Sequence, residues 1–484
     1  MKKYIFQVLL PAAMILALFA CTKNFEEMNT DPNQLTKVPY QSLMTNAQNS
    51  ILRTYMPKQG GVVSWSRYYV RDVYVHGDRY SGTGADESFF GAYAGHLKDL
   101  QIAMKQAEAA GDNNWLAVGK ILTAYAYQNI TDSYGDIPYS EALKADDPDK
   151  PNIFPKYDTQ QSIYADLIVQ LKAANAMINT SKNIGTADIV FNGNMLKWKM
   201  FGNSLMLRIY MRMSRVDAAT AKAGIEEIAG NPSTYPVIDS NSNAAIKSWL
   251  PNDATYRSPF YMIPTQAAIQ ENAMEAYLIN FLKTRNDLRL TVYAEPAASS
   301  GEYVGLPLGT LGQNTPDLSL EGIKFFQSAD TPTRVLRYSE VLFIYAEAAL
   351  NGWNVGMTAK AAYEAAIKAS FDEYGLAIGN YLSDPKVAFD GASNQRELIG
   401  DQKWCALFAD GFQGFAEIRR TGYPVYVATT EPVGALFPGK GVIKRFPYPY
   451  SEAINNPASL AAALVAQPGI VNEKFGKGVW WDID

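Results

Sequence analysis

The sequence predicts a mainly α-helical protein with long irregular loops and one large domain. Apolar residues recur at helical spacing in several segments from about residue 40 onward. Between these segments lie four long stretches rich in Gly, Pro, Asn and Ser, which are residues 57–90, 230–264, 294–332 and 421–458. Loops of this length are usually functional or disordered, and their aromatic content argues against disorder. No apolar-poor linker divides the chain, so we expect residues 37–484 to form a single domain.

The composition allows a packed core and disfavours several functions. The chain has 484 residues, of which 48% are hydrophobic and 19% charged, and its net charge is −5. This charge offers no general attraction to phosphate backbones, so we expect no nucleic-acid partner. Two His and two Cys residues leave little material for a soft-metal site or a His-dependent triad. We expect no cofactor, and Asp146, Asp147 and Asp149 lack the alternating pattern of a calcium loop.

The first residues read as an export signal. Two lysines precede an apolar run that ends at Ala20, as in a secretory signal peptide. The segment Leu18-Phe19-Ala20-Cys21 resembles a bacterial lipobox, in which the cysteine is lipidated. Residues 1–20 would then be removed, Cys21 would carry the lipid, and residues 21–36 would form an extended tether. The alternative is a plain secretory or membrane-anchoring signal with a chance cysteine.

Three apolar stripes predict helices in the first half of the chain. They run through residues 115–130, 163–178 and 195–216, and the second follows the capping residues Asp158 and Thr159. Trp115 and Trp198 belong to such stripes and are expected in the core. Trp404 is expected there too, beside Cys405, a lone thiol that survives best when buried.

Residues 334–351 and 358–374 predict a helical hairpin. Ala346, Ala348 and Ala349 would face an aromatic stripe that includes Tyr363 and Phe371, as in the close packing of tetratricopeptide-type helix pairs. The spacing does not repeat at a fixed interval, so a regular solenoid is not predicted. Trp480 and Trp481 near the end of the chain are expected to pack or to contact a partner.

Catalytic motifs are weak throughout. Residues 434–441 fall one residue short of a phosphate-binding loop, and neither a zincin motif nor a nucleophile elbow occurs. His76 and His96 are single and separated. Asp132, Asp136 and Glu141 are interpreted as acids that cap and solvate a turn after a helix. Since a glycosidase needs only two suitably placed carboxylates, a surface glycoside hydrolase stays an alternative.

Eight segments in a fixed order carry a family resemblance. They are Asn29–Asn33, Asp132–Ala142, Pro155–Gln160, Trp198–Ser214, Arg337–Ala348, Gln402–Trp404, Arg419–Pro424 and Arg445–Asn455. Behind a lipobox, this series resembles the SusD/RagB family of Bacteroidetes outer-membrane lipoproteins, in its divergent SusD-like branch. One departure is Leu288, which stands between Asp287 and Arg289 where the family pattern would have proline.

The resemblance implies a SusD-like helical scaffold and a non-enzymatic role at the outer membrane, facing the cell exterior. Such proteins act as lids on SusC-like TonB-dependent transporters and capture oligomeric nutrients, most often glycans. Oligosaccharide is therefore the expected ligand, and an oligopeptide is the alternative within the family. A purely structural lid that never contacts cargo is a further alternative.

Two loop-borne clusters have the residue types that a sugar site needs, which are flat aromatic rings and flexible polar groups. The first contains Trp65, Arg67, Tyr68, Tyr69, Tyr74 and Tyr80, and the second contains Trp249, Tyr256, Arg257, Phe260 and Tyr261. Trp65 and Trp249 are the expected ligand platforms, because no helical stripe would bury them. Loop packing or contact with the transporter is the alternative for each aromatic residue.

Overall fold

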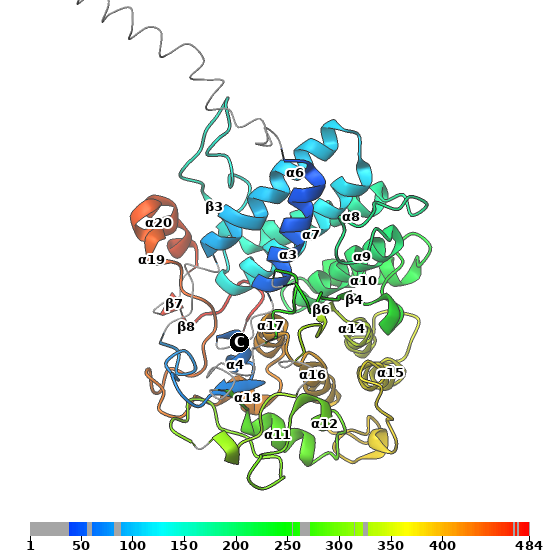
Figure 1. Cartoon of the computed structure of the whole chain (residues 1–484), viewed down its shortest axis with the longest axis vertical. Helices are drawn as coiled ribbons and strands as arrows, with labels where there is room; N and C mark the ends of the chain where they lie inside the picture. Colours follow the sequence, from blue (N-terminus) through cyan, green and yellow to red (C-terminus); the bar gives the residue numbers. More distant parts are fainter. Residues whose placement is uncertain are drawn as a thin grey trace, which may run out of the picture. The chain divides into compact units, whose positions relative to one another are not determined.

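The computed structural model describes residues 38–55, 61–81, 89–253, 255–261, 272–313, 315–322, 328–467, 470–471 and 474–483. The proposed lipidation site Cys21 and the tether 21–36 lie outside these residues. Residues Tyr40–Asp484 form one compact unit. Within the described ranges, no helix is long and apolar enough to cross a membrane. The predicted fold class is confirmed, because helices dominate and the strands are two to four residues long and paired in two-stranded ribbons (Figure 1).

The helices of the first half pack on one another in chain order (Figure 1). Their bounds are α3 Tyr40–Thr54, α6 Lys98–Ala109, α7 Asn113–Tyr134, α8 Gln160–Met177, α9 Met195–Arg212 and α10 Ala218–Gly230. Asp112, Thr159 and Asn194 cap α7, α8 and α9 with side-chain oxygens that accept from backbone N–H groups in the first turn. The three predicted helices are thus confirmed, and Trp115 and Trp198 are buried as expected.

The predicted helical hairpin consists of α14, Tyr338–Leu350, and α15, Ala359–Asp372. Ala346 and Tyr363 lie in one apolar cluster between the two helices. Gly352, just beyond α14, has φ +77°, a left-handed conformation that favours glycine at a helix end. The predicted start of the first helix is wrong, because Thr333–Leu336 form the strand β6, which pairs with β4, Ala245–Lys247.

Two further helices complete the centre of the unit, α16 at Gln395–Ala406 and α17 at Gly411–Thr421. Trp404 and Cys405 on α16 are buried as expected. Burial raises the pKa of the Cys405 thiol to about 12. Trp481 is also buried, which confirms its packing role.

Shorter elements lie in the loops and connections between these helices. They are α4 Val62–Trp65, β1 Tyr69–Arg71, the π-helical turn η1 Ala92–Leu97, β2 Ile137–Pro138, β3 Tyr157–Asp158, β5 Asn272–Met274, α11 Ala276–Lys283, α12 Leu290–Tyr293, α18 Val425–Thr429, α19 Tyr450–Asn455, α20 Pro457–Ala466, β7 Ile470–Val471 and β8 Phe475–Gly476. β1 and β5 are antiparallel, with Arg71 opposite Asn272. This pairing joins two loop regions that are about 200 residues apart in the sequence.

The departure at Leu288 leaves the surrounding corner intact. Asp287 and Arg289 form a fully buried ion pair, with 2.6 Å between Oδ2 and Nη2. Leu288 between them is exposed. The two charged residues of the expected motif therefore hold this corner without the proline.

Candidate functional site

Trp65 is not an exposed platform, and this prediction is corrected. Its side chain is only 4% exposed and lies among the rings of Tyr80, Phe415 and Phe446, with centroid distances of 6.1, 5.5 and 5.3 Å. Nε1 donates a hydrogen bond to the carbonyl of Gly77 at 3.2 Å. The physical reason is that the short helix α4 packs on α17 and turns this part of the loop inward.

Arg67 and Tyr68 are likewise buried, so neither can reach a ligand at the surface. Arg67 Nη1 contacts Glu275 Oε1 at 3.2 Å in a buried ion pair. The Tyr68 hydroxyl donates to the carbonyl of Trp404 at 2.8 Å, and the two rings are stacked. Burial raises the pKa of Glu275, although Arg67 opposes the shift. Both predicted contacts therefore belong to the scaffold.

Tyr74 is the member of the first cluster that does reach solvent. Its side chain is 69% exposed and follows the end of β1. The Arg71 guanidinium lies 5.4 Å from the centre of its ring. Tyr74 has φ +53°, an uncommon conformation for a bulky residue that fixes the ring at a tight turn. Tyr74 stays a candidate ligand contact.

Trp249 is also buried, at 3% exposure, which corrects the second platform prediction. Nε1 donates to Thr333 Oγ1 at 2.9 Å, at the start of β6. The Arg53 guanidinium and the Lys247 ammonium lie 4.8 and 5.1 Å from the ring centre. The pairing of β4 with β6 and these two cations cover a ring that the local sequence would leave exposed.

In the rest of the second cluster, Phe260 is buried and the other three side chains are partly accessible. Tyr256, Arg257 and Tyr261 are half-buried. The Arg257 guanidinium lies 5.2 Å from the centre of the Tyr261 ring. Arg53 donates to the carbonyls of Thr255 and Arg257, which fixes the turn that carries them. These three side chains stay candidate contacts.

The two loops thus present the same local arrangement, which we call the surface Arg–Tyr pairs, Arg71–Tyr74 and Arg257–Tyr261. Each pair offers a flat ring beside a guanidinium with several N–H donors. Such a pair can stack on an apolar face of a ligand and donate hydrogen bonds to its oxygens.

Sequence reasoning missed an aromatic groove at the start of η1 and α6. It encloses about 420 Å³ and is lined by Phe89, Phe90, Tyr93, Ala94, Lys98, Pro138, Ala142, Leu143, Ala145, Asp146, Asn152, Ile153, Pro155, Glu452, Asn455 and Asn456. Phe89 is buried, whereas Phe90 and Tyr93 are half-buried. The segment Phe89-Phe90-x-x-Tyr93 is the local signal, but its counterparts lie up to 367 residues away in the sequence.

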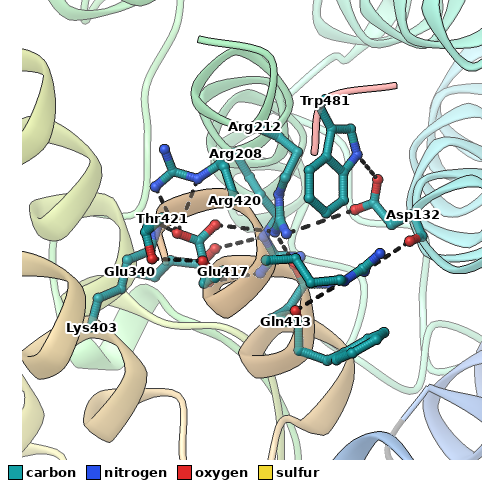
Figure 2. A network of polar contacts seen from close by, with 12 residues as sticks. Asp132, Arg208, Arg212, Glu340, Lys403, Gln413, Glu417, Arg420, Thr421 and Trp481 are labelled. Atoms are coloured by element: carbon teal, nitrogen blue, oxygen red, sulfur yellow. Dashed lines mark hydrogen bonds and ion pairs between the residues drawn. The ribbon is translucent and has the colours of Figure 1, made fainter. Parts of the chain in front are cut away.

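The acids considered for catalysis are held by structural hydrogen bonds. Asp132 is buried and accepts from Trp481 Nε1 at 2.8 Å (Figure 2). Asp136 is also buried and accepts from the backbone N–H of Gln160 at 2.9 Å. The expectation of solvated acids is therefore wrong for both, because residues of α8 and of the C-terminal segment contact the end of α7 and the turn that follows it. Glu141 accepts from Asn152 Nδ2 at 3.0 Å.

His96 is a buried structural residue, whereas His76 is exposed. The Ser50 and Tyr55 hydroxyls lie 3.3 Å from the two ring nitrogens of His96. Burial lowers the pKa of His96 to about 4. In the part of the chain that the structure describes, no group of three or more His, Cys, Asp or Glu side chains is placed to hold a metal ion.

A buried network of charges joins α9, α14, α16 and α17 (Figure 2). Glu417 lies at its centre, 2.9 Å from Lys403, 2.8 Å from Arg420 and 3.3 Å from Arg212. Burial alone would raise the pKa of Glu417, but these three cations outweigh it and hold that pKa well below its usual value. Arg208, Arg212 and Arg420, which lie on helices, therefore belong to the scaffold.

A family model described as "Starch-binding associating with outer membrane", named SusD-like_2, matches residues 32–449. A SusD homologue from Bacteroides fragilis is 25% identical, with a TM-score of 0.77 and coverage of 92% of this chain and 99% of its own. A chitin-binding SusD homologue from Flavobacterium johnsoniae is 24% identical, with a TM-score of 0.76 and coverage of 91% and 99%. No curated protein matches the sequence.

The match covers most of the chain and includes six of the eight segments of the resemblance completely, and the first and the last in part. The solved structures agree with the helical scaffold over nearly its full length. The chain therefore belongs to the SusD-like family of outer-membrane-associated binding proteins.

Proposed function

We propose that this protein captures oligosaccharides at the cell surface through the surface Arg–Tyr pairs. Family membership is the observation that carries the proposal, because the family is described as starch-binding. A SusD homologue with the same fold is described as chitin-binding, which agrees with a glycan ligand.

The chemistry of the pairs suits this ligand class. Sugar rings have apolar C–H faces that stack on aromatic rings, and their hydroxyls accept hydrogen bonds from guanidinium groups. Tyr74 is exposed, and Tyr256, Arg257 and Tyr261 are each partly accessible. Because Arg53 and the turn at Tyr74 fix both segments, the rings would be largely pre-positioned for binding.

We further propose that lipid on Cys21 anchors the protein to the outer membrane and that it serves as the lid of a SusC-like TonB-dependent transporter. Replacing Cys21 by Ser should release the protein from the membrane fraction without altering its fold. The measurement is detergent partitioning together with protease accessibility on whole cells. Unchanged behaviour of the variant in both assays would contradict the anchor.

The experiment that tests the ligand class is a glycan array beside a peptide library, followed by calorimetric titration of the best ligand. Tyr74→Ala and Tyr261→Ala should weaken binding of the selected glycan. Tyr450→Ala is the matched control, because Tyr450 is a 78% exposed tyrosine outside both pairs. Binding confined to peptides would replace the glycan assignment by oligopeptide capture.

Two outcomes would move the protein to another class. Release of reducing ends from candidate glycans would establish the glycoside hydrolase. Absence of measurable affinity for every glycan and peptide would favour a lid that does not contact cargo.

A further inference from the structure

A second cavity lies beside the turn of the α14–α15 hairpin, and we call it the hairpin pocket. It encloses about 420 Å³, and its lining includes Arg215, Glu347, Trp353, Arg396, Lys403 and Tyr423. None of these residues belongs to the surface Arg–Tyr pairs or to the aromatic groove. The pocket therefore needs an explanation of its own.

The lining of the hairpin pocket is strongly basic. Arg215, Arg396, Lys403 and Arg420 line it, whereas Glu347 is the one acidic residue of the lining. The whole chain is acidic, with a net charge of −5, so this accumulation of cations is local. A concave site lined by one sign of charge concentrates ligands of the opposite sign.

The buried floor neutralises its own acids. Both carboxylate oxygens of Glu347 accept from Arg420, at 2.6 Å each. Glu417, which lies behind the floor, is paired with Lys403 and Arg420 (Figure 2). The negative charges nearest to the pocket are therefore already compensated. Arg215 and Arg396 at the rim are not needed to balance them.

Two of the basic groups have donors to spare. Among the described residues, Arg396 donates to one acceptor, the amide oxygen of Asn351 at 2.6 Å, and a guanidinium has five N–H groups. Lys403 is 2% exposed and has Glu417 as its one acceptor there, although an ammonium has three N–H groups. For the buried Lys403, an N–H group without an acceptor is unfavourable, so an oxygen-rich ligand would improve the site.

The walls of the hairpin pocket are partly aromatic and apolar, so they can contact the uncharged part of a small ligand. Trp353 and Tyr423 are half-buried and line the pocket together with the buried Ile399. The Tyr423 hydroxyl accepts from Asn394 Nδ2 at 2.7 Å, which holds its ring in place. Aromatic walls can cover a sugar ring or a short apolar chain.

From these observations we propose that the hairpin pocket binds a small organic carboxylate, with the carboxylate held by Arg396 and Lys403 and its body against Trp353 and Tyr423. Two sources share this chemistry, an acidic sugar and the C-terminus of a peptide. Arg215, whose Nη1 donates to the carbonyl of Arg420 at 2.6 Å, flanks the same opening.

The test is a ligand-observed NMR titration of the purified chain with two matched pairs of probes. D-glucuronate is compared with its neutral methyl ester, and acetyl-Ala-Ala with its C-terminal amide. We expect at least one carboxylate to bind at least tenfold more tightly than its neutral partner, and the pair that does so identifies the source. Binding should also weaken as salt is added.

Variants then locate the site. Arg396→Gln should weaken binding of that carboxylate at least tenfold while leaving the melting temperature unchanged, because Arg396 is exposed. Arg215→Gln provides a second rim variant if the first is poorly folded, and Lys368→Gln, an exposed cation outside the pocket, is the control. Equal binding of charged and neutral probes, no binding of either carboxylate, or full binding by both rim variants would overturn the proposal. Neutral glycans tested with Tyr74→Ala report separately on the surface Arg–Tyr pairs.

Discussion

The two predicted clusters have similar loop sequences, and each contains a buried part and an exposed part in the structure. Trp65 and Trp249 belong to the buried parts, and Tyr74 and Tyr261 belong to the exposed parts. In both parts an arginine lies near an aromatic ring. Arg53 lies over the buried ring of Trp249, and Arg257 lies over Tyr261 at the surface. Burial decides which role such a pair can have, because a buried ring has its faces and its polar atom already occupied by the protein.

The largest expected effect lies in the buried parts. Trp65→Ala and Trp249→Ala should each lower the free energy of unfolding by about 3 to 5 kcal/mol, the usual cost of removing a buried tryptophan. Chemical denaturation would measure this loss. Glycan affinity per folded molecule should not change, since neither ring is accessible. A stable variant with weakened binding would return that tryptophan to the ligand site.

A pH dependence should also come from the buried region. Burial raises the pKa of Glu321, which lies near Tyr69, to about 8 from an ordinary value of 4.5. The folded state then holds this proton more tightly than the unfolded state, so stability falls as pH rises between 4.5 and about 8. The slope from one such group is about 1.4 kcal/mol per pH unit. Glu321→Gln should remove it in denaturation curves measured from pH 5 to 8.

The exposed residue Glu302 provides the control for this experiment. Glu302→Gln should leave the slope unchanged. If Glu321→Gln kept the full slope, the pH dependence would have to come from other buried acids, such as Asp78, whose pKa burial raises to about 6, and Asp401 and Asp410, whose pKa values burial raises to about 7.

The exposed parts should respond in binding and not in stability. Tyr74→Ala and Tyr261→Ala are expected to weaken glycan binding by about 1 to 3 kcal/mol, as for aromatic contacts at binding sites. Tyr74→Ala should change the free energy of unfolding by no more than about 0.5 kcal/mol, because Tyr74 is exposed. Calorimetric titration beside thermal denaturation separates the two. Loss of stability without loss of affinity would place these rings in the scaffold.

The smallest effect on binding is expected from removal of the Arg257 guanidinium, which lies over the Tyr261 ring. Arg257→Gln should weaken glycan binding by about 0.5 to 1 kcal/mol, the range of a cation–aromatic contact at an exposed site. Arg257→Lys keeps the charge but not the planar donor group. If both variants bind the glycan equally weakly, binding requires the planar donor group of arginine. If Arg257→Lys binds as tightly as the unmodified protein, the positive charge is sufficient.

The helical part of the fold could be predicted from the sequence because its signal is local. The stripes through Trp115 and Trp198 recur at helical spacing, and the capping residue Thr159 marks the start of α8. The sequence does not locate the start of α14, because a segment as short as Thr333–Leu336 does not distinguish a strand from a helix.

The site could be predicted only in part, because burial in a loop depends on distant residues. Trp65 is covered by Phe415 and Phe446, which lie at least 350 residues later in the sequence. No local pattern around Trp65 contains that information. Tyr74 is exposed and Tyr261 is half-buried, but their sequence surroundings resemble those of Trp65. The aromatic groove and the hairpin pocket were missed for a related reason, since each combines side chains from several separate segments.

Cys405 has a practical consequence for studies of this protein. Alkylating dyes react with the thiolate, and a buried thiol with a pKa of about 12 is almost never ionised under native conditions. With Cys21 replaced by Ser, a cysteine introduced near either surface pair or at the rim of the hairpin pocket would be the one site that a maleimide fluorophore labels. A single reporter dye could therefore follow ligand capture in real time without removal of the native cysteine from the core.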